Sequence, residues 1–377
     1  MIDPVQLSQT LIQKPSLTPN DADCQIHIAN LLSEAGFTCR DLSSADTKNL
    51  YAYHGKGAPH LLFVGHTDIV PAGEHWQHPP FSATIDQNKL YGRGAVDMKT
   101  AVAAMVSAGI DFASNHANHA GTIAFALTSD EEGPATNGSC KIVDHLKNEH
   151  QHFEYCVIGE PSSENVMGDM CKIGRRGSLQ ADITIHGKQG HVAYPNNAIN
   201  PIHIALLALH TLCQQKWDEG NEHFPATQFQ ISNIHAGEGT ENVIPGNMQI
   251  KSNFRFSPES SPSYLQNKVE DCLRQHQVQF NIDWRLKAEP FYFSPKTLAA
   301  ICQTAIHETC QIQTCFSTTG GTSDGRFFQH VCDELIELGM PHTTAHQVDE
   351  YCLVKDIQHL KIIYQKIVSA VFAKNST

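Results

Sequence analysis

Acidic and imidazole side chains stand at the ends of several apolar segments of this 377-residue chain. They are His66, Asp68, Asp97, Glu131, Glu132, Glu160 and, late in the chain, His346. Two divalent ions held roughly 3.5–4 Å apart need hard carboxylates and neutral imidazoles, with one carboxylate able to bridge them and a position left for water. The residue types in this set therefore suit a pair of zinc ions.

Each of these residues also has an ordinary structural explanation. An acidic residue at a strand end often caps a helix or faces solvent, and a lone histidine is more often structural than a ligand. Histidines are frequent in the chain, and His145, His150 and His152 lie in a polar stretch with no strand or turn to bring them together. We predict a solvated helix end and loop there. The metal hypothesis depends on the fold bringing the first set together.

The segments that carry these residues alternate between helical and strand patterns. An amphipathic stretch over 22–35 is closed by Gly36, and short apolar runs over 60–66, 121–130 and 155–161 predict buried strands. This alternation is typical of an α/β fold. In open α/β sheets, ligands bind beyond the carboxyl ends of the strands, where the acidic and imidazole residues stand.

From Ser178 onward the pattern changes to a strict alternation of apolar and polar residues, which predicts a half-exposed antiparallel strand. The further elements expected in this segment are a helix over 199–212, strands over 227–235 and 247–256, a helix over 263–276 and a strand over 279–286. The helix and strand patterns of the first segment resume after Pro290 and end in a helix over 354–372. We therefore predict one domain from residues 1–176 and 291–377, with an inserted α+β domain from 177–290.

Composition and charge exclude several classes of protein. Hydrophobic residues make up 41% of the chain and charged residues 17%, which is typical of a soluble globular protein. The net charge of −13 repels polyanions, so we expect no nucleic-acid partner. No apolar run reaches membrane-spanning length, residues 1–15 lack the pattern of a secretory signal, and the twelve cysteines include no C-x-x-C pair. We expect a cytoplasmic protein with reduced thiols and no membrane association.

Four short motifs in the first half of the chain carry a family resemblance. They are GHTDIVP (65–71), YGRGAVDMK (91–99), SDEEGPA (129–135) and GEP (159–161). In order and spacing they are similar to the zinc-dependent aminoacylase and carboxypeptidase family. The resemblance implies a zinc-peptidase-like mixed sheet flanked by helices, and an inserted ferredoxin-like domain that serves as a dimerisation or lid domain. It also implies an amidohydrolase that removes an N-acyl group from an amino acid.

The resemblance assigns a metal or catalytic role to each of the acidic and imidazole residues. It implies that His66 and Glu160 bind one zinc ion, that Glu132 and His346 bind the other, and that Asp97 bridges them, with cobalt or manganese possible in the second site. By the same resemblance Glu131 is the general base, and the bond Asp97–Met98 is a cis peptide. Asp68 is expected to accept the second N–H of the His66 imidazole and so to fix its tautomer.

The inserted segment contains GHVAYP (190–195), which resembles a family motif whose histidine reaches the active site of a partner subunit. His191 is that candidate, and we expect it to hydrogen-bond the oxygen of a tetrahedral intermediate. The resemblance thus implies a homodimer joined through the inserted domain. From sequence alone, without the resemblance, the pattern favours an ordinary turn histidine at this position.

Further residues match substrate contacts of the family. They are Arg175, Ser178, Tyr194, Asn242, Arg255, Gly321 and Thr322. These residue types suit a small N-acyl amino acid bearing several carboxylates, although exposed arginines and a tight glycine turn would explain some of them equally well. Two other functions stay open: a family member with another acyl preference, such as a deacetylase or a broader aminoacylase, and a non-catalytic metal-binding dimer of the same fold.

Overall fold

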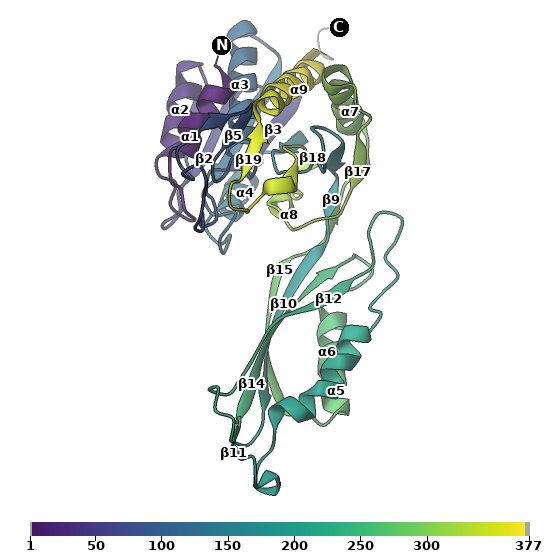
Figure 1. Ribbon diagram of the computed structural model, residues 1–377. Coiled ribbons are helices and arrows are strands. Elements are labelled where there is room, and N and C mark those ends of the chain that lie inside the picture. Colours follow the sequence, from purple (N-terminus) through teal and green to yellow (C-terminus); the bar gives the residue numbers. More distant parts are fainter. Residues whose placement is uncertain (1, 374–377) are drawn as a thin grey trace. The chain divides into compact units, whose positions relative to one another are not determined.

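The computed structural model describes residues 2–373, which form two compact units (Figure 1). The larger unit comprises the chain up to Gly174, Tyr292–Ser317, and the chain from Ser323 onward. The smaller unit comprises Arg175–Phe291 together with Thr318–Thr322. The sequence prediction assigned residues 318–322 to the first domain, but hydrogen bonds to the smaller unit attach them there instead.

The larger unit is built on an eight-stranded mixed sheet. In order across the sheet, its strands are β1 (Thr38–Asp41), β2 (Asn49–Lys56), β6 (Gly121–Thr128), β3 (His60–His66), β7 (Phe153–Ile158), β18 (Cys332–Glu337), β8 (Met170–Lys172) and β17 (Cys315–Ser317). The four central strands β6, β3, β7 and β18 are parallel. Strand β6 is buried along its whole length and β3 from its second residue on, as expected for parallel strands covered on both faces.

Helices cover this sheet (Figure 1). They are α1 (Pro4–Ile12), α2 (Cys24–Glu34), α3 (Lys99–Asn115), α4 (Ser139–Asn148), α7 (Thr297–Cys310), α8 (Gly325–Phe328) and α9 (Val354–Ala373), with the 3-10 turn η2 (His342–Thr344). Helix α3 is buried from Lys99 to Ala113 and packs against α1 and α9. The rings of Phe63 and Tyr364 meet edge-on between the sheet and α9, with their centroids 5.3 Å apart. This core fixes the strand ends that carry the candidate ligands.

A small three-stranded sheet also belongs to the larger unit. Its strands are β19 (Tyr351–Leu353), β5 (Lys89–Tyr91) and β4 (Ile85–Asp86). Strand β19 pairs antiparallel with β5, with Tyr351 opposite Tyr91. The chain just after β5 and the chain just before β19 are therefore held together, although they are far apart in sequence.

The smaller unit is a four-stranded antiparallel sheet with two helices. Its principal elements in chain order are β10 (Gly177–His186), α5 (Pro201–Gln214), β12 (Gln228–Ala236), β14 (Asn247–Phe256), α6 (Pro262–Gln275) and β15 (Phe280–Ala288). This βαββαβ order, with the strands arranged β12-β14-β10-β15, confirms the predicted ferredoxin-like unit. Burial along β10 alternates because the helices cover one face of the sheet.

The remaining short elements lie in the connections. They are β9 (Gly174–Arg175), β11 (Gly190–His191), η1 (Pro195–Asn197), β13 (Val243–Ile244) and β16 (Phe291–Tyr292). Among residues 2–373, no helix combines the length and apolar character needed to cross a bilayer. All twelve cysteines are free thiols, and seven of them are buried.

Candidate metal centre

The candidate ligands of the larger unit gather at the carboxyl ends of neighbouring parallel strands. His66 is the last residue of β3, Glu132 follows β6, and Glu160 follows β7. Asp97 precedes α3, and His346 lies between η2 and β19. Because β6, β3 and β7 lie side by side in the sheet, their ends bring these side chains to one edge.

These five residues form two triads that share Asp97. His66, Asp97 and Glu160 make one triad, and Asp97, Glu132 and His346 the other, with the ligand atoms of each triad within 4.8 Å of one another. The Nε2 atom of His66 lies 3.1 Å from Oδ1 of Asp97, and the Nε2 atom of His346 lies 3.2 Å from Oδ2. The two oxygens of Asp97 therefore face different histidines, which is the geometry required of a bridging carboxylate.

The electrostatics of the cluster show that it needs positive charge. Burial, together with the neighbouring carboxylates of Asp97 and Glu131, raises the pKa of Glu160 well above its usual range. Hydrogen bonds to Asp97 and Glu132 raise the pKa of His346 to about 10. Three carboxylates and two imidazoles fit a pair of divalent ions, zinc included.

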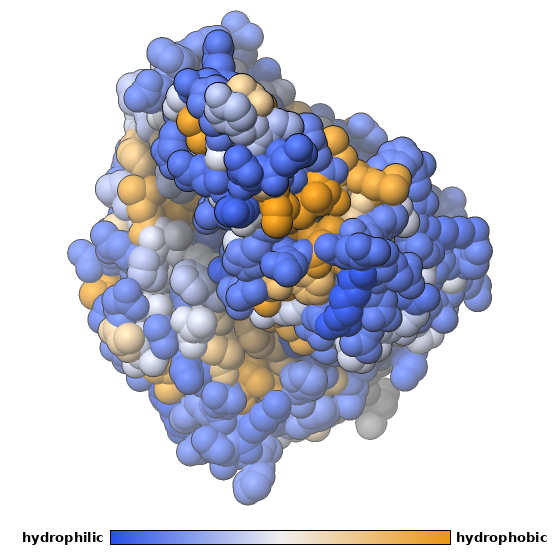
Figure 2. All heavy atoms as spheres, turned by 90° about the horizontal axis from the view of Figure 1, so that it is seen from below, coloured by the Kyte–Doolittle hydropathy of each residue, from blue (hydrophilic) through white to orange (hydrophobic). Residues whose placement is uncertain are grey.

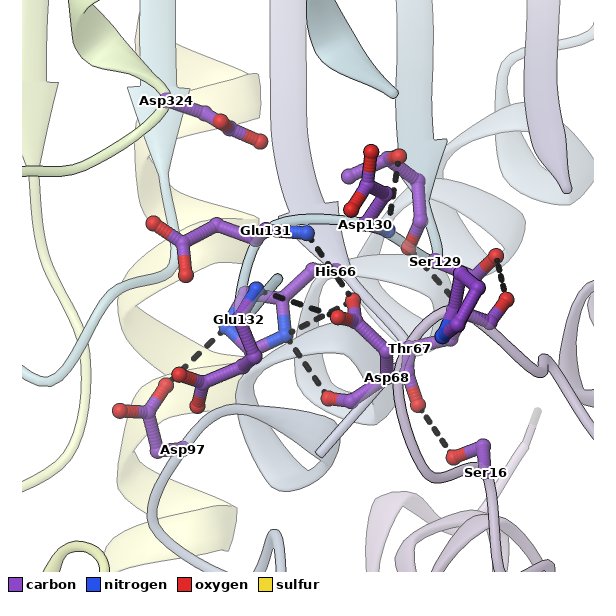
Figure 3. Close-up of polar contacts among 12 residues, drawn as sticks. Ser16, His66, Thr67, Asp68, Asp97, Ser129, Asp130, Glu131, Glu132 and Asp324 are labelled. Atoms are coloured by element: carbon purple, nitrogen blue, oxygen red, sulfur yellow. Dashed lines mark hydrogen bonds and ion pairs between the residues drawn. The ribbon is translucent and has the colours of Figure 1, made fainter. Parts of the chain in front are cut away.

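Asp68 makes a different contact from the one predicted (Figure 3). The Nδ1 atom of His66 lies 3.0 Å from the backbone oxygen of Asp68 and 3.6 Å from its carboxylate. The carboxylate instead accepts the backbone N–H groups of Glu131, at 3.3 Å, and Glu132, at 3.1 Å. The backbone carbonyl is thus the acceptor that fixes the His66 tautomer, and the Asp68 side chain positions the segment carrying the next two acids.

Glu131 lies beside the ligands and is suited to handling protons. It forms a further close group with His66 and Glu132. Burial and the nearby carboxylate of Asp324 raise the pKa of Glu131 well above its usual range. The Ser139 hydroxyl donates a hydrogen bond to Oδ2 of Asp324 at 2.5 Å. The Oδ1 atom of Asp324 is buried and has no hydrogen-bond partner among residues 2–373. Sequence reasoning missed Asp324, because an acid after a glycine pair also suits a simple turn.

The chain also contains the cis peptide bond between Asp97 and Met98 that the resemblance predicted.

Two further charged residues near the ligands were assigned no role from sequence. Arg93 and Glu350 form an ion pair in which both side chains are almost completely buried. Arg93 lies inside one of the family motifs, but a motif does not reveal which distant residue pairs with it.

The smaller unit gathers three arginines near the start of β10. Ser178 on β10 lies opposite Arg255 on β14, and Arg175 donates to the backbone oxygen of Thr319 at 3.1 Å. Burial and the neighbouring charges of Arg176 and Arg175 lower the pKa of Arg255. The Nη1 atom of Arg255 is buried with no hydrogen-bond partner among the described residues.

Gly321 and Thr322 belong to the same unit. The segment that carries them is attached by the Thr318 hydroxyl, which donates to the backbone oxygen of His223 at 2.5 Å. The Thr322 hydroxyl oxygen is buried without a partner in the described part of the chain. A side chain built at Gly321 would meet no atom within 4 Å, so the backbone there is open to a ligand.

His191, Tyr194 and Asn242 form a separate group beyond the other end of β10. His191 pairs with Val243 between β11 and β13, and the backbone oxygen of Asn242 accepts the N–H of Val192 at 3.1 Å. The rings of His191 and Tyr194 lie 5.6 Å apart, and both side chains are exposed. Strand β10 runs ten residues from Gly177 to His186, roughly 30 Å at the usual rise per residue. Within one copy of the smaller unit, this group and the arginine cluster therefore lie far apart, toward opposite ends of β10.

A sheet whose parallel strand ends gather two ligand triads, combined with an inserted βαββαβ unit, defines a class of α/β metallohydrolases. The family model described as peptidase family M20/M25/M40 matches residues 62–370. The chain belongs to this family.

Comparison with known proteins gives nearer relatives. The chain is 46% identical over 373 residues to succinyl-diaminopimelate desuccinylase of Acinetobacter baylyi, covering 98% of this chain and 99% of the relative. It is 46% identical over 366 residues to the protein of the same name from Coxiella burnetii, covering 97% and 98%.

Solved structures share the fold at low identity. An M20 family metallo-carboxypeptidase from Sulfolobus solfataricus matches with a TM-score of 0.84 at 15% identity, over 99% of both chains. A dinuclear metal-binding peptidase of the M20 family from Bacillus subtilis matches with a TM-score of 0.73 at 16% identity, over 98% of both chains. The expected zinc-peptidase-like fold is thereby confirmed.

Proposed function

We propose that this chain is a cytoplasmic di-zinc amidohydrolase that converts N-succinyl-L,L-2,6-diaminopimelate to succinate and L,L-diaminopimelate, a step in diaminopimelate and lysine biosynthesis. The observation that carries the proposal is the pair of ligand triads sharing Asp97. The proposed substrate is based on the names of the two relatives, each of which is 46% identical over nearly the whole chain.

His66 and Glu160 would hold one ion, Glu132 and His346 the other, and Asp97 both. Two zinc ions, when bound, polarise a carbonyl oxygen and lower the pKa of a water molecule. Cobalt or manganese could replace zinc in the second site, since imidazole and carboxylate ligands accept these metals.

Glu131 is the proposed general base. Its raised pKa suits a carboxylate that takes a proton from the attacking water and returns it to the departing amine near neutral pH. Asp68 holds the backbone of Glu131 and Glu132, so it positions the base and a ligand together.

The arginine cluster is the proposed substrate subsite. Arg175 and Arg255 would bind substrate carboxylates by charge-assisted hydrogen bonds, with Ser178, Gly321 and Thr322 beside them. Arg255 has an unused buried donor, which a carboxylate oxygen would satisfy.

We also propose that the protein is a homodimer joined through the smaller unit. Strand β12 is an edge of the four-stranded sheet, and the side chain of Ile234 on it is 56% exposed. On α5, Leu206 is 59% exposed and Leu207 is 62% exposed. Hydrophobic side chains also gather on the mainly hydrophilic face drawn in Figure 2. An open strand edge beside exposed leucines suits pairing with a second copy.

In such a dimer the partner would bring its own group of three residues, His191, Tyr194 and Asn242, to the substrate, with His191 as an oxyanion donor. Mixing a His191→Ala protein with a Glu131→Ala protein tests this arrangement. Each variant alone should be nearly inactive, and mixed dimers should recover activity in the sites that combine Glu131 of one copy with His191 of the other. If no mixture recovers activity, although mixed dimers form, the shared site is wrong.

The substrate proposal is tested by comparing succinyl and acetyl donors on one purified sample with added zinc. We expect preference for the succinyl donor and loss of activity on chelation. Faster turnover of acetylornithine would indicate a deacetylase or broader aminoacylase with the same metal centre. Absence of hydrolysis with any donor, despite bound zinc, would indicate a non-catalytic metal-binding dimer.

A further inference from the structure

A buried ion pair joins the backbone segments of two candidate metal ligands. Arg93, just after β5, donates from Nη1 to Oε2 of Glu350, just before β19, at 2.5 Å. Their side chains are 2% and 0% exposed. The two residues are held together by the pairing of β5 with β19, and by the Gly92 N–H, which donates to the backbone oxygen of Glu350 at 3.0 Å.

The carboxylate of Glu350 holds the segment of the bridging ligand. Its Oε1 atom accepts the backbone N–H of Val96 at 2.7 Å and that of Asp97 at 3.2 Å. These N–H groups precede helix α3 and are not paired within it. Glu350 therefore fixes the backbone from which the Asp97 side chain extends.

The guanidinium of Arg93 holds the segment of another ligand. Its Nη2 atom lies 3.3 Å from the backbone oxygen of His346, and 3.3 and 3.2 Å from those of Pro71 and Ala72, in the chain that follows β3. His346 has a left-handed backbone, with φ of 61°, and its side chain is 48% exposed. Packing alone therefore holds His346 weakly, and the contact from Arg93 supplies a fixed point.

The cost of burying this pair argues for a purpose beyond stability. Removing two charges from water is costly, and replacing a buried pair with apolar residues of similar volume is often neutral or stabilising. An apolar pair, however, could not bond the backbone of Asp97 and of His346.

We propose that Arg93 and Glu350 are positioning residues that set the spacing of Asp97 and His346, and thereby the geometry of the second metal site. The inference rests on the proposed metal centre. Neither residue belongs to the two candidate ligand triads. Groups that orient metal ligands typically affect metal affinity by roughly 10- to 100-fold.

The test is zinc affinity, measured by competition with a chromophoric chelator and independent of turnover. The double variant Arg93→Met/Glu350→Leu removes both charges together, so it leaves no unpaired buried charge. We expect the site of Glu132 and His346 to weaken by roughly 10- to 100-fold, and the site of His66 and Glu160 to change less. The absorption spectrum of the cobalt-loaded variant should change as well, because the ligand geometry changes.

Two further variants make the outcome decisive. Arg93→Lys keeps the charge, but a lysine ammonium cannot bond Glu350 and three backbone carbonyls at once. We therefore expect it also to weaken zinc binding at the second site. If the double variant does not fold, this variant alone tests the positioning role. Arg40→Lys is the matched control, because Arg40 forms an exposed ion pair with Glu149 in the same unit. It should leave both affinities unchanged.

His346→Ala separates the two proposals. The positioning role alone is overturned by a combination of two results. His346→Ala loses one ion, whereas the folded Arg93→Lys and double-variant proteins keep the zinc affinities and the cobalt spectrum of the wild type. Retention of both ions at wild-type affinity in His346→Ala overturns the metal centre itself.

Discussion

The two units hold buried clusters of opposite charge. In the larger unit, parallel strand ends gather carboxylates whose burial raises the pKa of Glu160 and Glu131. In the smaller unit, antiparallel neighbours gather arginines whose burial lowers the pKa of Arg255. The carboxylates of the first cluster favour the binding of cations, and the arginines of the second favour the binding of anions. This difference supports the proposal that the larger unit binds metal and that the smaller unit recognises substrate carboxylates.

The largest effect is expected in the larger unit. Glu131→Gln removes the proton acceptor but keeps the shape of the side chain, so turnover should fall at least about 100-fold while two zinc ions remain bound. Steady-state kinetics with metal analysis of the same sample checks this. Nearly full turnover with both ions present would remove Glu131 from its role.

A smaller effect is expected in the arginine cluster. Arg255→Met deletes charge-assisted hydrogen bonds of about 1.5–3 kcal/mol each, so the KM for the succinyl donor should rise about 10- to 100-fold. The KM for N-acetyl-diaminopimelate, which lacks only the succinyl carboxylate, should rise less. Arg274→Met on the exposed face of α6 is the control. An equal rise for both donors would show that the cluster does not recognise the succinyl group.

The smaller unit also contains a carboxylate, that of Asp218, which is stabilised by hydrogen bonds. We expect these hydrogen bonds to make the stability of the folded protein depend on pH in the acid range. Although burial opposes it, hydrogen bonds from Ser260 and Thr227 lower the pKa of Asp218 from 3.8 to about 2. The folded state therefore favours the ionised form, and this stabilisation is present above pH 3.8 and lost as the pH falls toward about 2.

Asp218→Asn should consequently lower the thermal midpoint most at neutral pH, and its difference from wild type should shrink below about pH 4. Calorimetry at several pH values measures the difference. Asp271→Asn, exposed on α6, is the control. A difference that is independent of pH would mean that the Asp218 charge does not matter.

The smallest effect concerns a histidine pair in the larger unit. Nδ1 of His54 lies 2.9 Å from Nε2 of His119, and burial together with the mutual charge effect lowers the pKa of His54 from 6.5. The fold favours the neutral rings, so their contribution is full above pH 6.5 and is lost as the pH falls below it. The midpoint of His119→Gln should differ from wild type more at about pH 7.5 than at about pH 5.5. The reverse order would contradict this sign.

The sequence predicted the elements of the smaller unit closely, because alternation on a half-buried sheet leaves a strong pattern. The strand expected over 247–256 is observed as Asn247–Phe256. Four of the five candidate ligands could be predicted because they stand inside the four motifs that carry the family resemblance, whereas His346 lies in a separate segment late in the chain. The histidines at 145, 150 and 152 lie at a helix end and in the loop after it, since α4 ends at Asn148. The predicted solvation is wrong for His145, which is half-buried and whose Nε2 atom is buried.

Contacts between distant segments could not be predicted in the same way. No local pattern indicates that Glu350 pairs with Arg93, or that Thr318–Thr322 attaches to the smaller unit. The Asp68 contact was predicted for the wrong oxygen, because residue spacing cannot distinguish a backbone carbonyl from a carboxylate. Such details depend on the path of the chain after β3.

Anomalous diffraction at the zinc edge, from crystals of the zinc-loaded protein, tests the shared metal centre most directly. We predict two peaks roughly 3.5–4 Å apart, one beside His66 and Glu160 and the other beside Glu132 and His346, with Asp97 between them. A single peak, or peaks that do not contact Asp97, in a preparation that hydrolyses substrate would contradict the account.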